Sequence, residues 1–378
     1  MKTCYLSICI LCLLFSGCLS ERSNESVLIE FNVSASYPEK EIKLEDISEI
    51  EYLQLELDED FLYNSPQVII SSSKIITFNR HNGDVLVFSR EGKPLSKFNH
   101  QGNGPGEYIV IPTNGVVYDE TTDELFVVYR NIMVYSLSGE FKRSMPLPSL
   151  GNIEIVNYDA QTFLLYEELN QYPTPPFSLI SKENGSLVET IDIPTGKNVF
   201  IHVVLRHENN ISVIRAPAYR IVKHNAGYLL TDFSTDTLYY LSPEKKLSPI
   251  LARKPAIQSM DPVVTLNGFV EAGNYEFVSV VPAKLENNRF PVTYLMRDKK
   301  TGSIYRQKIT FNGYKGKEVT LSPETIANTQ NSKLGLIVLG LTELQDANRE
   351  NRLSGRLKEL VENSDEDGND IYMLLHFK

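Results

Sequence analysis

The 378-residue chain is acidic and contains ample apolar material. Hydrophobic residues make up 42% of it and charged residues 22%, and 37 Lys and Arg against 48 Asp and Glu give a formal net charge of −11 at pH 7. This composition suffices for one large or two ordinary domains. A nucleic-acid partner is not expected, because such proteins need a basic face to neutralise phosphates.

The N-terminus is typical of an export signal. All four cysteines lie within the first 18 residues, so the body of the chain holds no disulfide and no thiolate metal site. The apolar run Tyr5–Phe15 is too short to span a bilayer and fits the core of a signal peptide. We expect residues 1–17 to be that peptide, residues 18–26 to be a polar tether, and residues 27–378 to form a single domain.

Small residues directly before Cys18 resemble the lipobox of bacterial lipoproteins. The resemblance implies cleavage before Cys18 and lipidation of that cysteine, which would anchor the protein to a membrane. The sequence departs from the pattern at Phe15, where leucine is usual. The alternative is an ordinary secretory signal that is cut nearby.

The first elements after the tether are short. Val27–Val33 predicts an apolar strand, and Pro38–Asp46 is interpreted as a polar connector. In Ile47–Leu57, leucines alternate with polar residues, and this two-residue period predicts a strand with one buried face.

Residues 73–108 form the first complete repeat unit. The dipeptide Asn82-Gly83 separates two apolar runs, and it is a strong hairpin signal because its turn requires positive φ at both central residues. Val85–Phe88 is apolar on both faces and must be covered on both sides. Sheets stacked between similar sheets provide such cover, as in a β-propeller.

Four later segments repeat this plan of strand, turn and strand at intervals of roughly 45–60 residues. They are Gly115–Leu150, Ile153–Pro194, Phe200–Leu251 and Val263–Phe311. The fourth unit starts with the expected strand Ile211–Arg215 and is long enough to carry a loop insertion. Repeats of this length predict four-stranded antiparallel propeller blades.

The C-terminal region departs from the repeat. Thr342 and Gln345 have the spacing of a capping box, and an apolar stripe from Leu353 to Val361 predicts a short helix. A last apolar strand, Ile371–Phe377, follows. We expect it to pair with Ile47–Leu57 and complete a blade, which would cover two free sheet edges. The predicted fold is therefore all-β, a six-bladed β-propeller closed by its two ends, with seven blades as the alternative.

Several motifs resemble those of bacterial cell-envelope lipoproteins with six-bladed propellers of the NHL-repeat type. They are the lipobox at Cys18, the GNGPGEY motif at Gly102–Tyr108, the segment Thr235–Tyr239, and the terminal strand. Leu238 stands where isoleucine is more usual. The resemblance implies a propeller fold and a lipid-anchored location in the envelope, and it implies no particular activity.

The link Gln101–Tyr108 is the first candidate for a functional site. In a propeller such a link crosses one face toward the central channel, and its glycines permit close approach of the backbone. It would present Glu107 and Tyr108 at the channel mouth. Alternatively, the link fixes the crossing between blades, and Glu107 accepts backbone hydrogen bonds.

The densest basic and aromatic cluster lies in Lys197–His207 and Arg215–His224. Its candidate ligand-binding residues are His202, Arg206, His207, Arg215, Tyr219, Arg220 and His224. Arginine is a bidentate donor, so the cluster would suit an anionic or sugar-like ligand. The alternative is scattered surface charge that balances acidic neighbours.

No motif of a catalytic nucleophile, a zinc site or a phosphate-binding loop is present, so no catalytic residue is assigned. The first hypothesis is a binding or scaffolding module, without a cofactor, for a peptide, glycan or protein partner at the channel mouth. The second is a metal-assisted enzyme of the lactonase, lyase or hydrolase type, with a divalent ion such as calcium in the central channel, by analogy with other propellers.

The lipobox leads to a direct prediction. Metabolic labelling with a fatty-acid analogue should mark the protein, and Cys18→Ala should abolish the label because the thiol is the acceptor. Retention of the label in Cys18→Ala would contradict lipidation at this residue.

Overall fold

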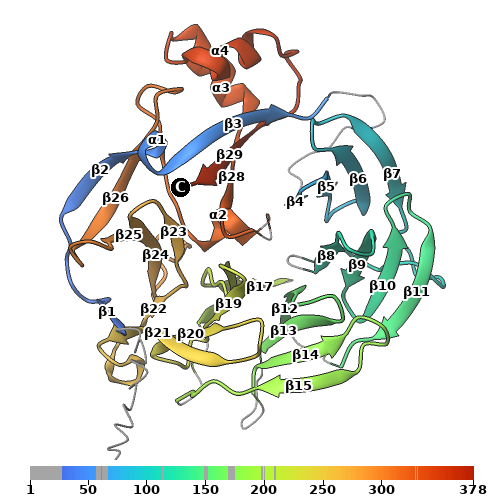
Figure 1. Cartoon of the computed structure of the whole chain (residues 1–378), viewed down its shortest axis with the longest axis horizontal. Helices are drawn as coiled ribbons and strands as arrows, with labels where there is room; N and C mark the ends of the chain where they lie inside the picture. Colours follow the sequence, from blue (N-terminus) through green and yellow to red (C-terminus); the bar gives the residue numbers. More distant parts are fainter. Residues whose placement is uncertain are drawn as a thin grey trace, which may run out of the picture.

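In the computed structural model, the chain forms a ring of twisted β-sheets (Figure 1). The structure describes residues 28–56, 61, 67–112, 115–148, 152–168, 175–196, 199, 201–207, 210–327, 329 and 331–378. The expected signal peptide, Cys18 and the tether lie outside this range. None of the helices within it has the length and apolar character required to cross a bilayer.

Four blades are plain antiparallel meanders, and in each of them consecutive strands are hydrogen-bonded neighbours. The first comprises β4 (Gln67–Ile70), β5 (Lys74–Phe78), β6 (Asp84–Ser89) and β7 (Pro94–Asn99). The second comprises β8 (Val116–Asp119), β9 (Glu124–Val128), β10 (Asn131–Ser136) and β11 (Phe141–Pro146). The third comprises β12 (Asn152–Asn157), β13 (Thr162–Glu168), β14 (Phe177–Ser181) and β15 (Leu187–Ile191). The fourth comprises β18 (Ile221–His224), β19 (Gly227–Leu230), β20 (Thr237–Leu241) and β21 (Leu247–Lys254).

The fifth blade has an interrupted inner strand. Its strands are β22 (Val264–Leu266), β23 (Val270–Ala272), β24 (Tyr275–Pro282), β25 (Thr293–Asp298) and β26 (Ile304–Thr310). Both β22 and β23 pair with β24, and the short strand β27 (Glu318–Val319) pairs with β26.

The fourth blade differs from the expectation in its first strand. The segment Ile211–Arg215 belongs to a separate hairpin of β16 (His202–His207) and β17 (Asn210–Arg215). This hairpin accounts for the extra length of the fourth unit, and the blade itself begins at β18. Sequence reasoning placed Ile211–Arg215 in the blade because a hairpin strand and a blade strand share the same alternation.

The two ends of the chain form a three-stranded sheet of β28 (Leu334–Leu339), β29 (Ile371–Phe377) and β3 (Ser48–Gln54). β29 pairs antiparallel with β3 from Ile371 opposite Gln54 to Phe377 opposite Ser48, which confirms the expected pairing of the ends.

The expectation of six four-stranded blades is corrected: the described residues form five, and the closing sheet has only three strands. The segment between β28 and β29 forms two helices, α3 (Leu341–Arg349) and α4 (Gly355–Glu362), where a fourth strand would be needed. These helices lie outside the ring, beyond β3 (Figure 1). α3 begins at Leu341 without a side-chain cap, so the expected capping box at Thr342 is not used.

The N-terminal segment runs along the outer edges of two blades. β1 (Ile29–Asn32) adds a parallel strand to β21, and β2 (Glu39–Lys43) adds one to β26. Interpreting Pro38–Asp46 as a connector was therefore wrong. β2 was missed because Ile42 is its one buried residue, while its charged side chains pair across the edge, as Glu41 does with Lys308 at 3.2 Å.

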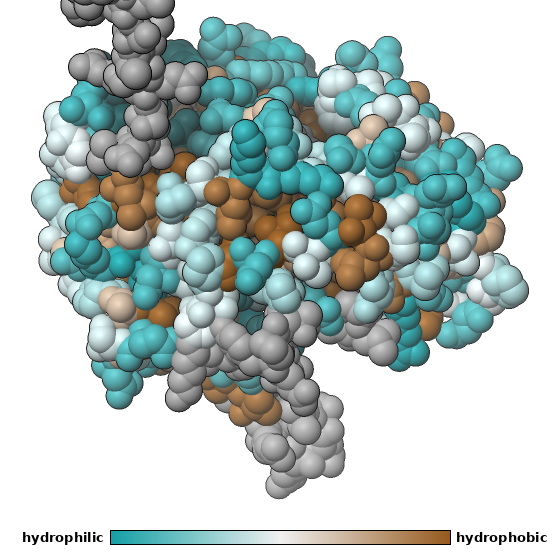
Figure 2. Space-filling view, turned by 60° about the horizontal axis from the view of Figure 1, so that its bottom comes forward, coloured by the Kyte–Doolittle hydropathy of each residue, from teal (hydrophilic) through white to brown (hydrophobic). Residues whose placement is uncertain are grey.

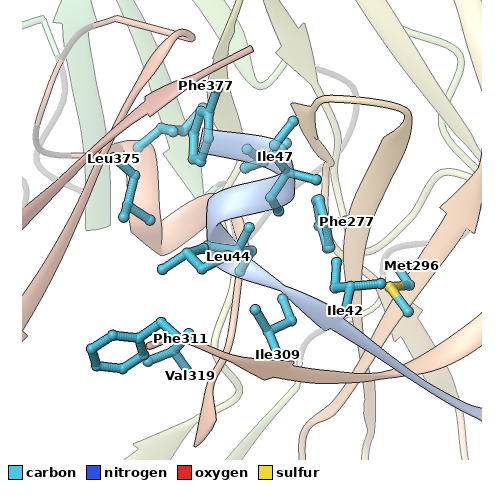
Figure 3. Packing of buried hydrophobic residues seen from close by; sticks show 14 of the residues in the cluster. Ile42, Leu44, Ile47, Phe277, Met296, Ile309, Phe311, Val319, Leu375 and Phe377 are labelled. Atoms are coloured by element: carbon cyan, nitrogen blue, oxygen red, sulfur yellow. The ribbon is translucent and has the colours of Figure 1, made fainter. Parts of the chain in front are cut away.

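The N-terminal segment also fills the space between the fifth blade and the closing sheet (Figure 3). Leu44 and Ile47 of the short helix α1 (Leu44–Ile47) are buried in the same apolar cluster as Ile42. The cluster includes Phe277, Met296 and Ile309 of the fifth blade and Leu375 and Phe377 of β29. The N-terminal segment thus joins the fifth blade to the closing sheet through apolar contacts.

The outer edge of the third blade is apolar at the beginning of β15. β15 exposes Leu187 and Val188, and the sheet has no strand beyond β15 within the described residues. Figure 2 brings the side of β15 and β21 forward and shows apolar side chains gathered there among hydrophilic ones. This edge contrasts with those of β21 and β26, which β1 and β2 cover.

Closure by β29 leads to a stability prediction. Leu374→Ala should lower the free energy of unfolding by about 2–5 kcal/mol, because it opens a cavity where Leu374 is fully buried between β3 and β28. Val338→Ala in the adjacent β28 should change it by about 0.5 kcal/mol or less, because Val338 is half exposed. Urea denaturation measures both, and similar losses in the two variants would contradict the role of β29.

Candidate functional site

The inner strands of the ring enclose a small central cavity of about 90 Å³. β4, β8, β12 and β18 supply most of its wall, and α2 (Pro323–Ala327) contributes Ile326 and Ala327. The wall is largely apolar, with Glu154, Tyr219 and Lys223 among its polar members. This cavity lies between the inner strands of the blades, where a propeller has its central channel.

A larger cavity of about 470 Å³ adjoins it, which we call the arginine mouth. Arg80, Arg215 and Arg220 line it together with Glu154 and Glu168. Because Glu154 lines both cavities, the two lie directly next to each other. The arginine mouth therefore brings together Arg215 and Arg220 of the basic cluster and Arg80, which follows β5 of the first blade.

Arg220 is held against aromatic rings. Its side chain is buried, with the guanidinium carbon 3.5 Å from the centroid of the Phe233 ring and 5.4 Å from that of Tyr166. Such stacking stabilises a guanidinium and leaves its edge free for planar hydrogen bonding. The Tyr166 hydroxyl donates to Asp232 at 2.7 Å, and burial raises the pKa of Tyr166 well above its usual value.

Arg215 is an accessible cation of this mouth, as is the exposed Arg80. It ends β17, its side chain is 55% exposed, and its Nε lies 3.9 Å from the Glu168 carboxylate. An exposed pair at this distance is weak, so Arg215 remains available to a ligand. His202 lies opposite Arg215 in the hairpin register and is exposed. Arg206 and His207 are also in β16, but their side chains lie outside the described part of the structure.

Glu154 is the main residue that sequence reasoning missed. From β12 its carboxylate accepts the backbone N–H groups of Arg220 at 3.0 Å and Ile221 at 3.2 Å. Burial raises the pKa of Glu154 to about 7, although these hydrogen bonds and the Arg220 charge lower it. The signal that could have identified Glu154 is its position between Ile153 and Ile155 in an inner strand. A carboxylate enclosed in this way requires a hydrogen-bond partner or a raised pKa.

Tyr219 and His224 have different surroundings. Tyr219 lines the central cavity, and burial, together with the nearby Glu324 carboxylate, raises its pKa well above the usual value. The His224 ring packs edge-on against Phe269, with centroids 5.1 Å apart, and burial lowers its pKa. His224 therefore has the contacts of a neutral packing residue.

The GNGPGEY link has the contacts expected of a structural crossing. Glu107 Oε2 accepts the Gly104 N–H at 2.7 Å, and a Cβ on Gly102 would lie 2.0 Å from the same oxygen. The buried Tyr108 hydroxyl donates to Gly83 O at 2.5 Å and accepts from His100 N at 3.0 Å. Burial raises its pKa to about 12. These bonds tie the link back to the first blade.

Within the part of the chain that the structure describes, no three His, Cys, Asp or Glu side chains gather closely enough to hold a metal ion. The arrangement at the arginine mouth is suited to binding, because three arginines, one stacked and two exposed, line a single cavity. Glu154 lies on the same wall, and burial raises its pKa to about 7.

Comparison with known proteins places the chain in a family. The model of a domain of unknown function, DUF4934, matches residues 28–376. The chain belongs to this family. No curated protein matches the sequence significantly.

Among solved structures, a protein named as exported from Bacteroides fragilis shares the fold at a TM-score of 0.61. The two are 14% identical over 93% of this chain and 99% of that one. BamB from Moraxella catarrhalis matches at a TM-score of 0.39 and 12% identity, covering 71% of this chain and 84% of that one. Virginiamycin B lyase from Staphylococcus aureus matches at a TM-score of 0.32 and 11% identity, and the match covers 68% of this chain and 97% of that one. The first match supports the propeller fold of this DUF4934 protein, and the other two are too distant to support an argument.

Glu154 leads to a pH prediction for the DUF4934 protein. A group whose folded pKa is raised holds its proton more tightly in the folded state, so its contribution to stability falls as pH rises from 4.5 to about 7. Glu154→Gln removes this loss. The free energy of unfolding of Glu154→Gln minus that of wild type should therefore rise by up to about 3 kcal/mol between about pH 4 and pH 8.

Urea denaturation across this pH range measures the difference. The exposed Glu140 supplies the control, because Glu140→Gln makes the same substitution without disturbing a buried contact. A flat difference between Glu154→Gln and wild type across the pH range would contradict the prediction.

Proposed function

We propose that this protein is a lipid-anchored binding module of the bacterial cell envelope. Its propeller takes up a carboxylate-bearing peptide, or a segment of a protein partner, at the arginine mouth. The observation that carries the proposal is the Arg220 guanidinium, buried and stacked on Phe233 at the wall of a 470 Å³ cavity.

The energetics favour an anion there. Among the described residues, no carboxylate forms a salt bridge with the Arg220 guanidinium, although the charges of Arg220 and Glu154 interact. A ligand carboxylate would supply two charge-assisted hydrogen bonds to this buried group. Arg80 and Arg215 add positive charge to the same wall. Glu154 opposes an anion least when it is protonated, and its pKa near 7 keeps a large protonated fraction at neutral pH.

The neighbouring hairpin favours a peptide or protein over a small ion. Val204 of β16 and Val213 of β17 lie directly opposite each other, and both are over 40% exposed. They lie on the same face of the hairpin as Arg215, because alternate residues share a face. A peptide whose carboxylate reaches the mouth would cover this apolar pair.

The envelope location rests on the sequence. The apolar run Tyr5–Phe15 and the lipobox at Cys18 favour export and lipidation, and the likeness to NHL-type propeller lipoproteins agrees with them. A tether of residues 18–26 would hold the propeller close to the membrane that carries the anchor.

Fluorescence anisotropy with a labelled peptide tests the binding function. A fluorescein-labelled hexapeptide with glutamates and a free C-terminus should bind, whereas its glutamine, amidated counterpart should bind weakly. Arg220→Gln should weaken binding by about 10- to 100-fold, the equivalent of a lost charge-assisted hydrogen bond. Arg220→Lys should also weaken it, because lysine keeps the charge and loses the planar fork.

The exposed Arg349 of α3 supplies the matched control, and Arg349→Gln should bind the peptide as wild type does. Thermal unfolding checks that each variant folds. If Arg220→Gln does not fold, Arg215→Gln decides, because Arg215 is exposed. Equal affinity for the acidic and the amidated peptide would overturn the proposal.

A further inference from the structure

The opposite end of the channel opens into a second cavity of about 610 Å³, which we call the lysine mouth. Arg80 follows β5, whereas Ser71 and Ser72 precede it. Likewise Arg220 precedes β18 and Asn225 follows it. The arginine mouth and the lysine mouth therefore lie at opposite ends of the same strands.

The cations of the lysine mouth come from separate parts of the chain. They are Lys223 of β18, Lys333 before β28, and Arg90 after β6. Arg90 already pairs with Glu51 at 3.3 Å, and Lys333 is exposed. Two ammonium groups thus reach one cavity in an acidic protein.

Lys223 is the more enclosed of the two lysines. Its Nζ lies 4.2 Å from the centroid of the Tyr228 ring and donates one hydrogen bond, to Ala226 O at 3.3 Å. Burial lowers the pKa of Lys223. An anion in the mouth would favour the charged ammonium and supply acceptors for its remaining N–H groups.

A fixed carboxylate stands on the same wall. Glu120 Oε1 accepts the hydroxyls of Ser73 at 2.6 Å, Ser72 at 2.7 Å and Ser71 at 3.2 Å. Glu120 Oε2 accepts the Ser72 N–H at 3.3 Å. Burial raises the pKa of Glu120, but the hydrogen bonds from these serines outweigh burial and hold the pKa below its usual value. Glu120 is therefore an ionised acceptor with lone pairs left on Oε2.

The remaining wall is rich in hydroxyl and amide groups, from Ser71, Ser72, Asn225, Asn331 and Ser332. A ligand that matches it must carry an acidic group for the lysines and hydroxyl groups that donate to Glu120. A simple anion lacks the hydroxyl groups, and a neutral sugar lacks the charge. The volume lies within the roughly 300–1,000 Å³ of small-molecule sites.

We propose that the lysine mouth is a binding site for an acidic sugar, a carbohydrate that carries a carboxylate or a phosphate group. Lys223 and Lys333 hold the acidic group, and Glu120 accepts hydrogen bonds from the sugar hydroxyls. This site is independent of the proposed function at the arginine mouth, because the two share no residue.

Isothermal titration calorimetry on the purified full chain tests the site with four probes: glucuronate, glucose 1-phosphate, glucose and inorganic phosphate. At least one of the two acidic sugars should bind at least about tenfold more tightly than both glucose and inorganic phosphate, and the tighter one identifies the acidic group. If phosphate alone binds as tightly as the acidic sugars, the site is not specific for sugars.

Two variants assign the roles. Lys333→Gln should weaken acidic-sugar binding about tenfold, whereas Lys246→Gln, an exposed lysine in the β20–β21 turn, should leave it unchanged. Glu120→Gln should lower the affinity for the acidic sugars, because they lose the acceptor of their hydroxyl groups. In this variant, inorganic phosphate should still bind more weakly than the acidic sugars. Unchanged affinity in Lys333→Gln, or no binding of either acidic sugar, would overturn the proposal, and the exposed position of Lys333 keeps this test free of folding effects.

Discussion

The ring depends on the hydrogen bonding between β29 and β3, which pairs the last strand of the chain with a strand near its beginning. Each blade is apolar on its faces and requires a neighbour on both sides, so an open ring would leave two faces and two edges uncovered. Residues Ile371–Leu375 are almost completely buried in the closed form. The positions of both channel mouths follow from this closure.

Inside the ring, one carboxyl group joins structure to the chemistry of the channel. Glu154 links the third and fourth blades, which the inserted hairpin separates in sequence, by accepting two N–H groups at the start of β18. The same carboxyl lies at the boundary between the central cavity and the arginine mouth. Its protonation therefore affects the junction of two blades and the charge that faces a ligand.

The sequence predicted the propeller and the pairing of its ends, because alternation, Asn-Gly turns and repeat length are local signals. It did not predict β2, whose polar side chains pair across an edge, or the helices that replace a fourth strand in the closing sheet. It singled out Arg215 and Arg220 by their density of charge. Glu154, Glu120 and Lys333 escaped notice, because only the ring brings residues from distant turns to one mouth.

The path of the N-terminal segment has a consequence for biosynthesis. β1, β2 and β3 leave the ribosome first, but their partners β21, β26 and β29 are synthesised much later, and β29 ends close to the last residue. A nascent chain can build its middle blades one by one, whereas β3 has no partner strand until β29 has been made. Because contacts between such distant residues form slowly, closure of the ring by β3 and β29 is expected to be a late step of folding.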